Sequence, residues 1–221
     1  MICLKATESS RLQDRLSLPY EMPMKTALDV IRSEHRDLAA VLHGLQFLVR
    51  EVRERRREPD FKVLRAMVHY IDTFPEKLHH PKEDRHLFAR LRQRTTEARE
   101  VLDQLEAQHI HGAKLIRDLE QNLLRWEMEG RDSFAAFADE VDRYAEFHWR
   151  HMRQEEDVVL PLAERIFNAE DWREIDEAFA GHGDPLIDKG LENDLNRQFK
   201  RIVNMAPPPI GLGPEEPRRS S

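Results

Sequence analysis

Two histidine–glutamate pairs in this chain have the spacing of one helical turn. His79 precedes Glu83 by four residues, and His151 precedes Glu155 by four. Side chains at positions i and i+4 share a face of a helix, so each pair can present a ring nitrogen and a carboxylate to one point. A single pair of this kind is as typical of a surface ion pair as of a binding site.

Further histidines make a binding site the better interpretation, because they fall on apolar stripes. His35 lies on a stripe with Ile31 and Leu38, and His109 lies on a stripe with Leu105. A buried imidazole is costly unless its nitrogens find partners. Imidazoles and carboxylates that converge from several helices form metal sites in helical bundles. The side chains that converge by period alone are His35, His79, Glu83, His109, His151 and Glu155.

The donor types favour one class of metal. Imidazole suits iron, zinc, copper and nickel, whereas carboxylate prefers harder cations. The only cysteine is Cys3, close to the N-terminus, so we expect no thiolate in the site. Mixed nitrogen and oxygen donors favour non-haem iron, and two carboxylates from different helices can each bridge two ions about 3.5–4 Å apart.

Four segments with apolar residues at alternating spacings of three and four must position these side chains. Pro75 and Pro81 predict a kink in the second segment, and Gly130 separates the third from the fourth. The pattern predicts an all-α fold, an antiparallel up-down-up-down four-helix bundle with a short C-terminal helix and flexible tails. The predicted long helices are residues 27–57, 60–91, 96–129 and 134–166.

The chain is expected to divide into three parts. Residues 1–24 are predicted to be a flexible N-terminal extension, and residues 25–186 the bundle, with a short helix at 171–180. Residues 187–221 are predicted to be a tail that contains the end of one more helix, around 185–203, and a proline-rich, disordered terminus.

Composition excludes several classes of protein. The 221 residues are 40% hydrophobic and 35% charged, and the net charge of −7 gives no general support to a nucleic-acid partner. No apolar run approaches the roughly 18 residues of a membrane span, and the N-terminus lacks the apolar core of a signal peptide. A single cysteine fits a reducing compartment, so we expect a cytoplasmic protein.

In their order along the chain, the motifs resemble the hemerythrin-like (HHE cation-binding) family over about residues 25–186. The resemblance implies a non-haem di-iron centre, with two oxo- or hydroxo-bridged irons held by histidines from all four helices and bridged by two carboxylates. By position it assigns the same six ligands that the period selects. The matching stretches are residues 33–38 (SEHRDL), 79–88 (HHPKEDRHLF), 106–109 (EAQH), 148–161 (HWRHMRQEEDVVLP) and 171–175 (DWREI).

One histidine of the family pattern is missing. The oxygen carriers place two histidines one turn apart on the third helix, but the residue one turn after His109 is Ala113, and His111 points elsewhere. His148, on the stripe one turn before His151, is a candidate replacement ligand; otherwise it is a hydrogen-bond partner of a ligand.

Two further side chains, His80 and Tyr144, are weaker candidates for direct contact with a metal. His80 lies about 100° around the helix from His79, so we expect it to support a ligand or to lie on the surface. Tyr144 is one turn from His148 and is a candidate hydrogen-bond donor to a ligand or a bound oxygen species; the alternative is plain core packing.

The number of histidine ligands decides how many positions stay open. Two six-coordinate irons offer about twelve positions, of which two bridging carboxylates fill four and one bridging oxygen fills two. Five histidines then leave one open position, the count of a reversible O2 carrier. Four histidines leave two, which suits redox chemistry with peroxide or nitric oxide, or iron handling.

The leading hypothesis is a cytoplasmic di-iron protein that binds or senses O2, NO or peroxide. An alternative is an iron–sulfur repair or nitric-oxide-reducing di-iron protein; such relatives usually carry an N-terminal cysteine-bearing domain, whereas the leader here holds only Cys3. Another alternative is a redox-responsive interaction bundle that acts through a separate signalling partner or as a homodimer. A metal-free interaction bundle and the question of catalytic turnover also stay open.

Overall fold

The first helix begins where the sequence supplies a capping side chain. The computed structural model describes residues 26–180, 197, 199–206 and 210–212. Helix α1 (Ala27–Arg53) starts after Thr26, whose hydroxyl accepts a hydrogen bond from the Asp29 N–H at 3.2 Å, while the Asp29 carboxylate accepts one from the Thr26 N–H at 3.2 Å. α1 ends short of the predicted boundary at Arg57, because the chain turns through Arg55 with a φ of 58°.

The second and fourth long segments stay helical through their prolines because they contain π-helical turns. In these turns an N–H donates five residues back along the chain, as from His80 to the Pro75 carbonyl and from Leu160 to the Glu155 carbonyl. Proline has no N–H to donate, and the wider turn accommodates its missing hydrogen bond. The second segment comprises α2 (Phe61–Phe74), η1 (Pro75–His79), α3 (His80–Lys82), η2 (Glu83–Phe88) and α4 (Ala89–Arg94). The fourth comprises α6 (Phe134–Gln154), η4 (Glu155–Val159) and α7 (Leu160–Ile166).

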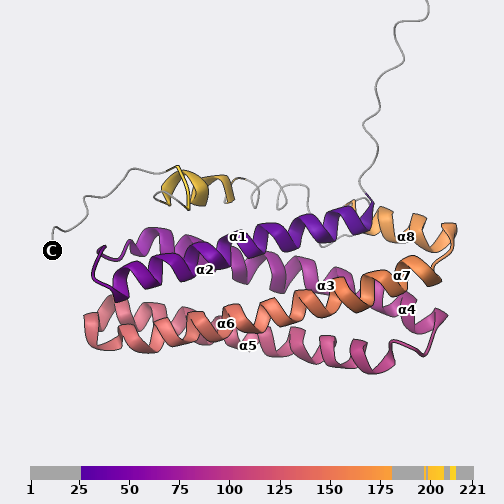
Figure 1. Ribbon diagram of the computed structural model, residues 1–221, viewed down its shortest axis with the longest axis horizontal. Helices are drawn as coiled ribbons and strands as arrows, with labels where there is room; N and C mark the ends of the chain where they lie inside the picture. The colour runs from indigo at the N-terminus through magenta and orange to yellow at the C-terminus, as the bar shows by residue number, and fades with distance from the viewer. Residues whose placement is uncertain (1–25, 181–196, 198, 207–209, 213–221) are drawn as a thin grey trace, which may run out of the picture.

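The long segments pack as the predicted all-α bundle. They lie side by side and alternate in direction, with α5 (Arg99–Glu129) joined to α6 through the short turn η3 (Gly130–Ser133) (Figure 1). Both α1 and α5 contact α2 and α6, which closes a four-sided arrangement. Within the described residues there is no strand, and each helix is too short or too polar to cross a bilayer.

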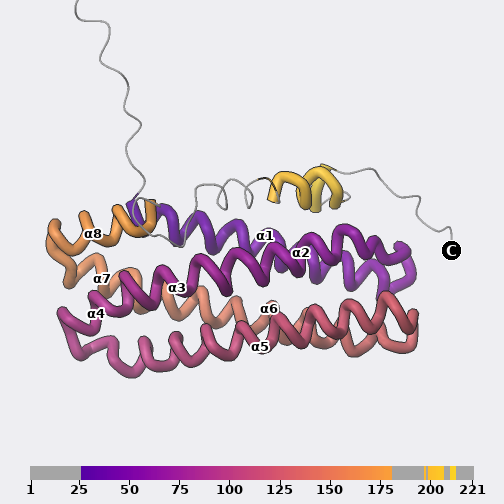
Figure 2. Tube along the Cα trace, turned by 180° about the vertical axis from the view of Figure 1, so that it is seen from behind, coloured from indigo at the N-terminus to yellow at the C-terminus, as the bar shows by residue number. Residues whose placement is uncertain are grey.

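Two further pieces cover parts of the bundle. Helix α8 (Ala169–Phe179) confirms the predicted short helix and packs against the start of α1 (Figure 1). Residues 199–205 are helical and lie along α1 and α2, which Figure 2 shows from the opposite side. Ile202 in this helix is buried against the core. The predicted helix between 185 and 196, and most of the two predicted tails, lie outside the described residues.

The interior divides into two apolar clusters along the bundle. One cluster is formed by residues such as Leu38, Leu78 and Ile116. The other contains Ile31 and Leu105, together with side chains of α4, α7 and α8. Each long segment therefore passes from one cluster to the other, and the polar candidates of the sequence fall at the crossing point.

One buried ion pair holds α8 against the second segment, and it generates a stability prediction. The Asp171 carboxylate is fully buried, accepts hydrogen bonds from Arg90 at 2.9 Å and Arg94 at 2.8 Å, and also accepts the Asn168 N–H at 3.1 Å. The hydrogen bond from Arg94 is the largest of the effects that hold the pKa of Asp171 below its usual value.

Asp171→Asn should lower the free energy of unfolding by about 1–3 kcal/mol at neutral pH, because two cationic groups lose a buried charged acceptor. The depressed pKa stabilises the fold above the carboxyl's ordinary pKa, so the difference from the native chain should shrink as the pH falls through the acidic range. Denaturant unfolding at several pH values measures this. Glu174→Gln, which removes only the exposed partner of Arg90, is the matched control and should change little; equal losses in both variants would contradict the assignment.

Candidate metal centre

Seven buried side chains meet where the two apolar clusters join. His35 enters from α1 between Ile31 and Leu38, and His109 enters from α5 between Leu105 and Ile116. The exposed fraction of each side chain's residue is 6% or less. The seven are His35, His79, His80, Glu83, His109, His151 and Glu155.

Their donor atoms fall into overlapping groups, each with the size of a coordination sphere. Within each group, one donor atom from every member lies within 4.8 Å of all the others. Glu83 and Glu155 belong to two of these groups, so they stand between two neighbouring positions for an ion. The groups are His35, His79, Glu83 and Glu155; Glu83, His109, His151 and Glu155; and His80, His109 and His151.

The structure thus brings together the six side chains that the sequence selected and adds His80. His80, which was expected to support a ligand or to lie on the surface, is only 3% exposed and so does not lie on the surface; its ring stacks on that of His109 with centroids 4.2 Å apart. The rings of His80 and His151 lie 5.1 Å apart. The sequence signal that could have identified His80 is the presence of Pro75 before and Pro81 after His79 and His80, because prolines within a helix indicate an irregular turn.

Most of these imidazoles are held from behind by an oxygen of another side chain. The Nδ1 atom lies 2.9 Å from Glu156 in His35, 2.7 Å from Glu34 in His79, 2.8 Å from Asp84 in His109 and 2.9 Å from Gln108 in His151. A hydrogen bond at Nδ1 fixes the ring and its tautomer and leaves Nε2 for a metal.

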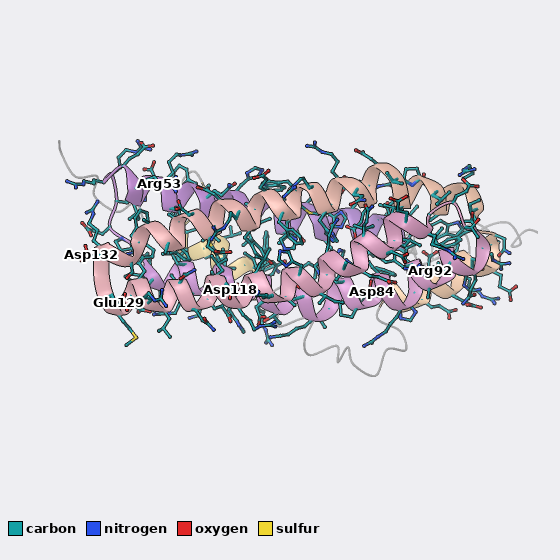
Figure 3. The ribbon with its side chains drawn as sticks, turned by 90° about the horizontal axis from the view of Figure 1, so that it is seen from below. Arg53, Asp84, Arg92, Asp118, Glu129 and Asp132 are labelled. Atoms are coloured by element: carbon teal, nitrogen blue, oxygen red, sulfur yellow. The ribbon has the colours of Figure 1, made fainter. Side chains whose placement is uncertain are left out.

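The position of the centre along the bundle can be followed from these supporting residues. Asp84, the partner of His109, lies between Asp118 and Arg92 along the long axis (Figure 3). The centre is therefore far from the bundle end that carries Arg53 and Asp132 (Figure 3).

The inward-facing atoms fit a cation. Within the described residues, the carboxylate oxygens of Glu83 and Glu155 and the Nε2 atoms of His109 and His151 are buried without a hydrogen bond of normal geometry. The Nε2 atoms of His35 and His79 face each other at 3.1 Å. Buried polar atoms without partners are costly, and a metal ion satisfies nitrogen and oxygen lone pairs together.

The protonation states of the cluster show which protons a metal must displace. Burial alone would lower the pKa of His35, but its contacts with the carboxylates of Glu155 and Glu156 outweigh burial and raise the pKa to about 9. His109 behaves in the same way: burial opposes, and Asp84 and Glu155 raise its pKa to about 9. These two imidazoles are therefore protonated at neutral pH when no metal is bound.

In the other members of the cluster the pKa shifts differ from one residue to the next. Burial lowers the pKa of His151 to about 4 and also lowers that of His79. Burial, together with the charge of Glu155, raises the pKa of Glu83 well above its usual value. For Glu155 the surrounding histidines, His151 first, outweigh burial and hold the pKa well below its usual value. The protein thus places one firmly ionised carboxylate among several imidazoles.

Two predicted site residues lie beside the cluster rather than in it. His148 is fully buried, but it belongs to none of the three groups, and its Nε2 lies 3.7 Å from Glu76. The Tyr144 hydroxyl donates to the same Glu76 carboxylate at 3.1 Å. Ligation by His148 and contact of Tyr144 with a bound species stay predictions, and His80 rather than His148 belongs to the group with His109 and His151.

Comparison with known proteins decides the family. The model of the hemerythrin HHE cation-binding domain matches residues 26–163. The chain belongs to this family. Searches of curated proteins and of solved structures returned no match. The match spans all four long segments and every member of the buried cluster, and the cluster fits the metal site that a cation-binding domain requires.

Metal affinity should rise steeply with pH between 7 and 9. Metal ligands must be deprotonated, and in the metal-free protein His35 and His109 hold protons up to a pKa of about 9. Each bound proton competes with the metal below that pKa, so the dependence should flatten above it. Calorimetric titration with Zn²⁺ in buffers of different ionisation enthalpy counts the released protons. Binding that is independent of pH in this range would contradict the protonation states described here.

Proposed function

We propose that this chain is a non-haem di-iron protein that binds or senses O2, NO or peroxide at the buried centre. The observation that carries the proposal is the sharing of Glu83 and Glu155 between two adjacent ligand groups. A carboxylate that faces two ion positions is suited to bridging them, and bridging keeps a pair of ions close.

The donor set supports iron. All donors are nitrogen or carboxylate oxygen, without thiolate, a set that non-haem iron accepts well. His35 and His79 would hold one ion, and His80, His109 and His151 the other. The supporting carboxylates of Glu34, Asp84 and Glu156 add negative charge around the centre, which favours a highly charged cation pair.

The count of donors supports binding of a small ligand. With five histidines and two bridging carboxylates, about one of the roughly twelve positions of two six-coordinate ions stays open once a bridging oxygen is included. When bound, the iron pair supplies that open position and its redox chemistry. The chain's own contribution is to pack Phe88 against the ring of His109 and Phe147 against the ring of His151, which helps to exclude bulk water from the buried centre.

The proposal extends to the setting of the protein. The single cysteine favours the reducing cytoplasm, and a homodimer or a separate signalling partner would transmit the state of the centre.

Metal analysis with an optical spectrum tests the proposal. The chain grown with iron, or reconstituted with ferrous salt, should contain about two irons, with near-ultraviolet charge-transfer bands that bleach on reduction. After reduction and exposure to air, a stable oxygenated spectrum would favour O2 binding, and direct oxidation would favour redox sensing. Failure to take up iron would contradict the proposal and leave zinc, manganese or a plain interaction bundle.

A pair of substitutions on α5 sharpens this test. His109→Ala removes a ligand and should cost at least one of the two irons and most of the charge-transfer absorption. His111→Ala is the matched control, because His111 is exposed, lies two residues away on the same helix and belongs to none of the ligand groups. Iron content and the optical spectrum of both variants measure the difference, and equal iron content in the two would place the metal elsewhere.

A further inference from the structure

His80 differs from the other four histidines of the centre. The Nδ1 atoms of the other four lie 2.7–2.9 Å from an oxygen of a supporting side chain. Within the described residues, the Nδ1 of His80 is buried and has no hydrogen bond of normal geometry. The Oε2 atom of the Glu76 carboxylate, one turn earlier on the same segment, lies 3.5 Å from this nitrogen.

The side chain of Glu76 is buried, and several polar groups surround its carboxylate. Its side chain is only 4% exposed, although a buried carboxylate is expensive without compensating partners. The Tyr144 hydroxyl donates to Oε1 at 3.1 Å, and the Nε2 of His148 lies 3.7 Å from the same oxygen. Three potential donors from two segments therefore surround this one carboxylate.

Helix α5 leaves space for the Glu76 carboxylate at Gly112. A Cβ atom at Gly112 would lie 2.9 Å from the Glu76 Oε1, too close for an undisturbed carboxylate. The π-helical turn Pro75–His79 separates Glu76 from His80, and the His80 N–H donates to the Pro75 carbonyl. Gly112, the buried Tyr144 and the π-helical turn Pro75–His79 together accommodate the carboxylate behind His80.

We propose that Glu76 is the positioning residue of His80: it accepts the Nδ1–H of His80 and so turns the other ring nitrogen toward His109 and His151. Through this contact Glu76 completes the three-histidine half of the centre, as Gln108 does for His151 and Asp84 for His109. Tyr144 and His148 act behind Glu76 and hold the carboxylate in place. This inference rests on the proposed two-ion centre, and it concerns the second of the two ions alone.

The test is titration of the full metal-free chain with Co²⁺, followed by its visible absorption, which reports the number and type of ligands around each ion. Glu76→Ala should weaken binding of the second ion by about 10–100-fold, the usual effect of removing an outer hydrogen-bond partner, and leave the first unchanged. Glu76→Gln keeps an acceptor oxygen and should restore most of the affinity.

Two comparisons separate positioning from general stability. His80→Ala should weaken the same ion, and the double variant with Glu76→Ala should be no weaker than His80→Ala alone, because both changes remove one function. Glu140→Ala is the matched control: it removes another buried carboxylate, paired with Arg143 on α6, and should leave both ions in place.

The outcomes are distinct. Should the native chain bind fewer than two ions, the two-ion centre itself fails. Native binding of two ions with unchanged affinity and spectrum in Glu76→Ala would overturn only the role of Glu76. Equal weakening of both ions, or full additivity in the double variant, would also overturn it. If Glu76→Ala does not fold, a Glu76→Gln spectrum identical to that of Glu76→Leu would contradict the proposal.

Discussion

The bundle depends on the balance between burial and coordination at the junction of its two apolar clusters. Glu83 and Glu155 are completely buried, and their oxygens find no hydrogen bond of normal geometry within the described residues. Such groups destabilise a core unless a cation binds them, so the energy that opposes folding of the metal-free chain becomes affinity for metal. Every long segment contributes to this junction, and the pairing of all four is therefore coupled to it.

The supporting residues explain how a fold made of ordinary helices can hold such a site rigidly. Glu34, Asp84, Gln108 and Glu156 each contact the outer nitrogen of one imidazole and come from segments that also supply ligands or their neighbours. A helix can place a side chain on a face, but it does not fix the rotation of an imidazole ring. The outer hydrogen bonds supply that missing constraint.

Helical periodicity was enough to predict most of the fold and much of the centre. His35 and His109 follow from the spacing of apolar residues, because α1 and α5 are regular helices over their whole length. The capped start of α1 and the break at Gly130 follow from local chemistry that the sequence displays directly.

The prediction was incomplete where the helix is irregular. A regular helix turns about 100° per residue, so His79 and His80 were not expected to face the same interior. The π turns Pro75–His79 and Glu83–Phe88 change the rotation around these residues, and both rings enter the cluster. The prolines indicate where the helix is irregular, but they do not indicate whether the helix kinks or forms a wider, π-helical turn. His148 was correctly expected to be buried, but its separation from the cluster depends on side-chain packing around Glu76 that no periodicity contains.

X-ray absorption at the iron edge of the loaded chain is the most direct test of a bridged iron pair, because it reports the neighbours of the metal without reference to activity. A bridged iron pair should give a shell of nitrogen and oxygen donors, imidazole scattering from both ions, and an iron–iron vector of no more than about 3.5–4 Å. An iron environment without imidazole scattering and without a second iron would contradict a bridged pair at the junction of the two clusters.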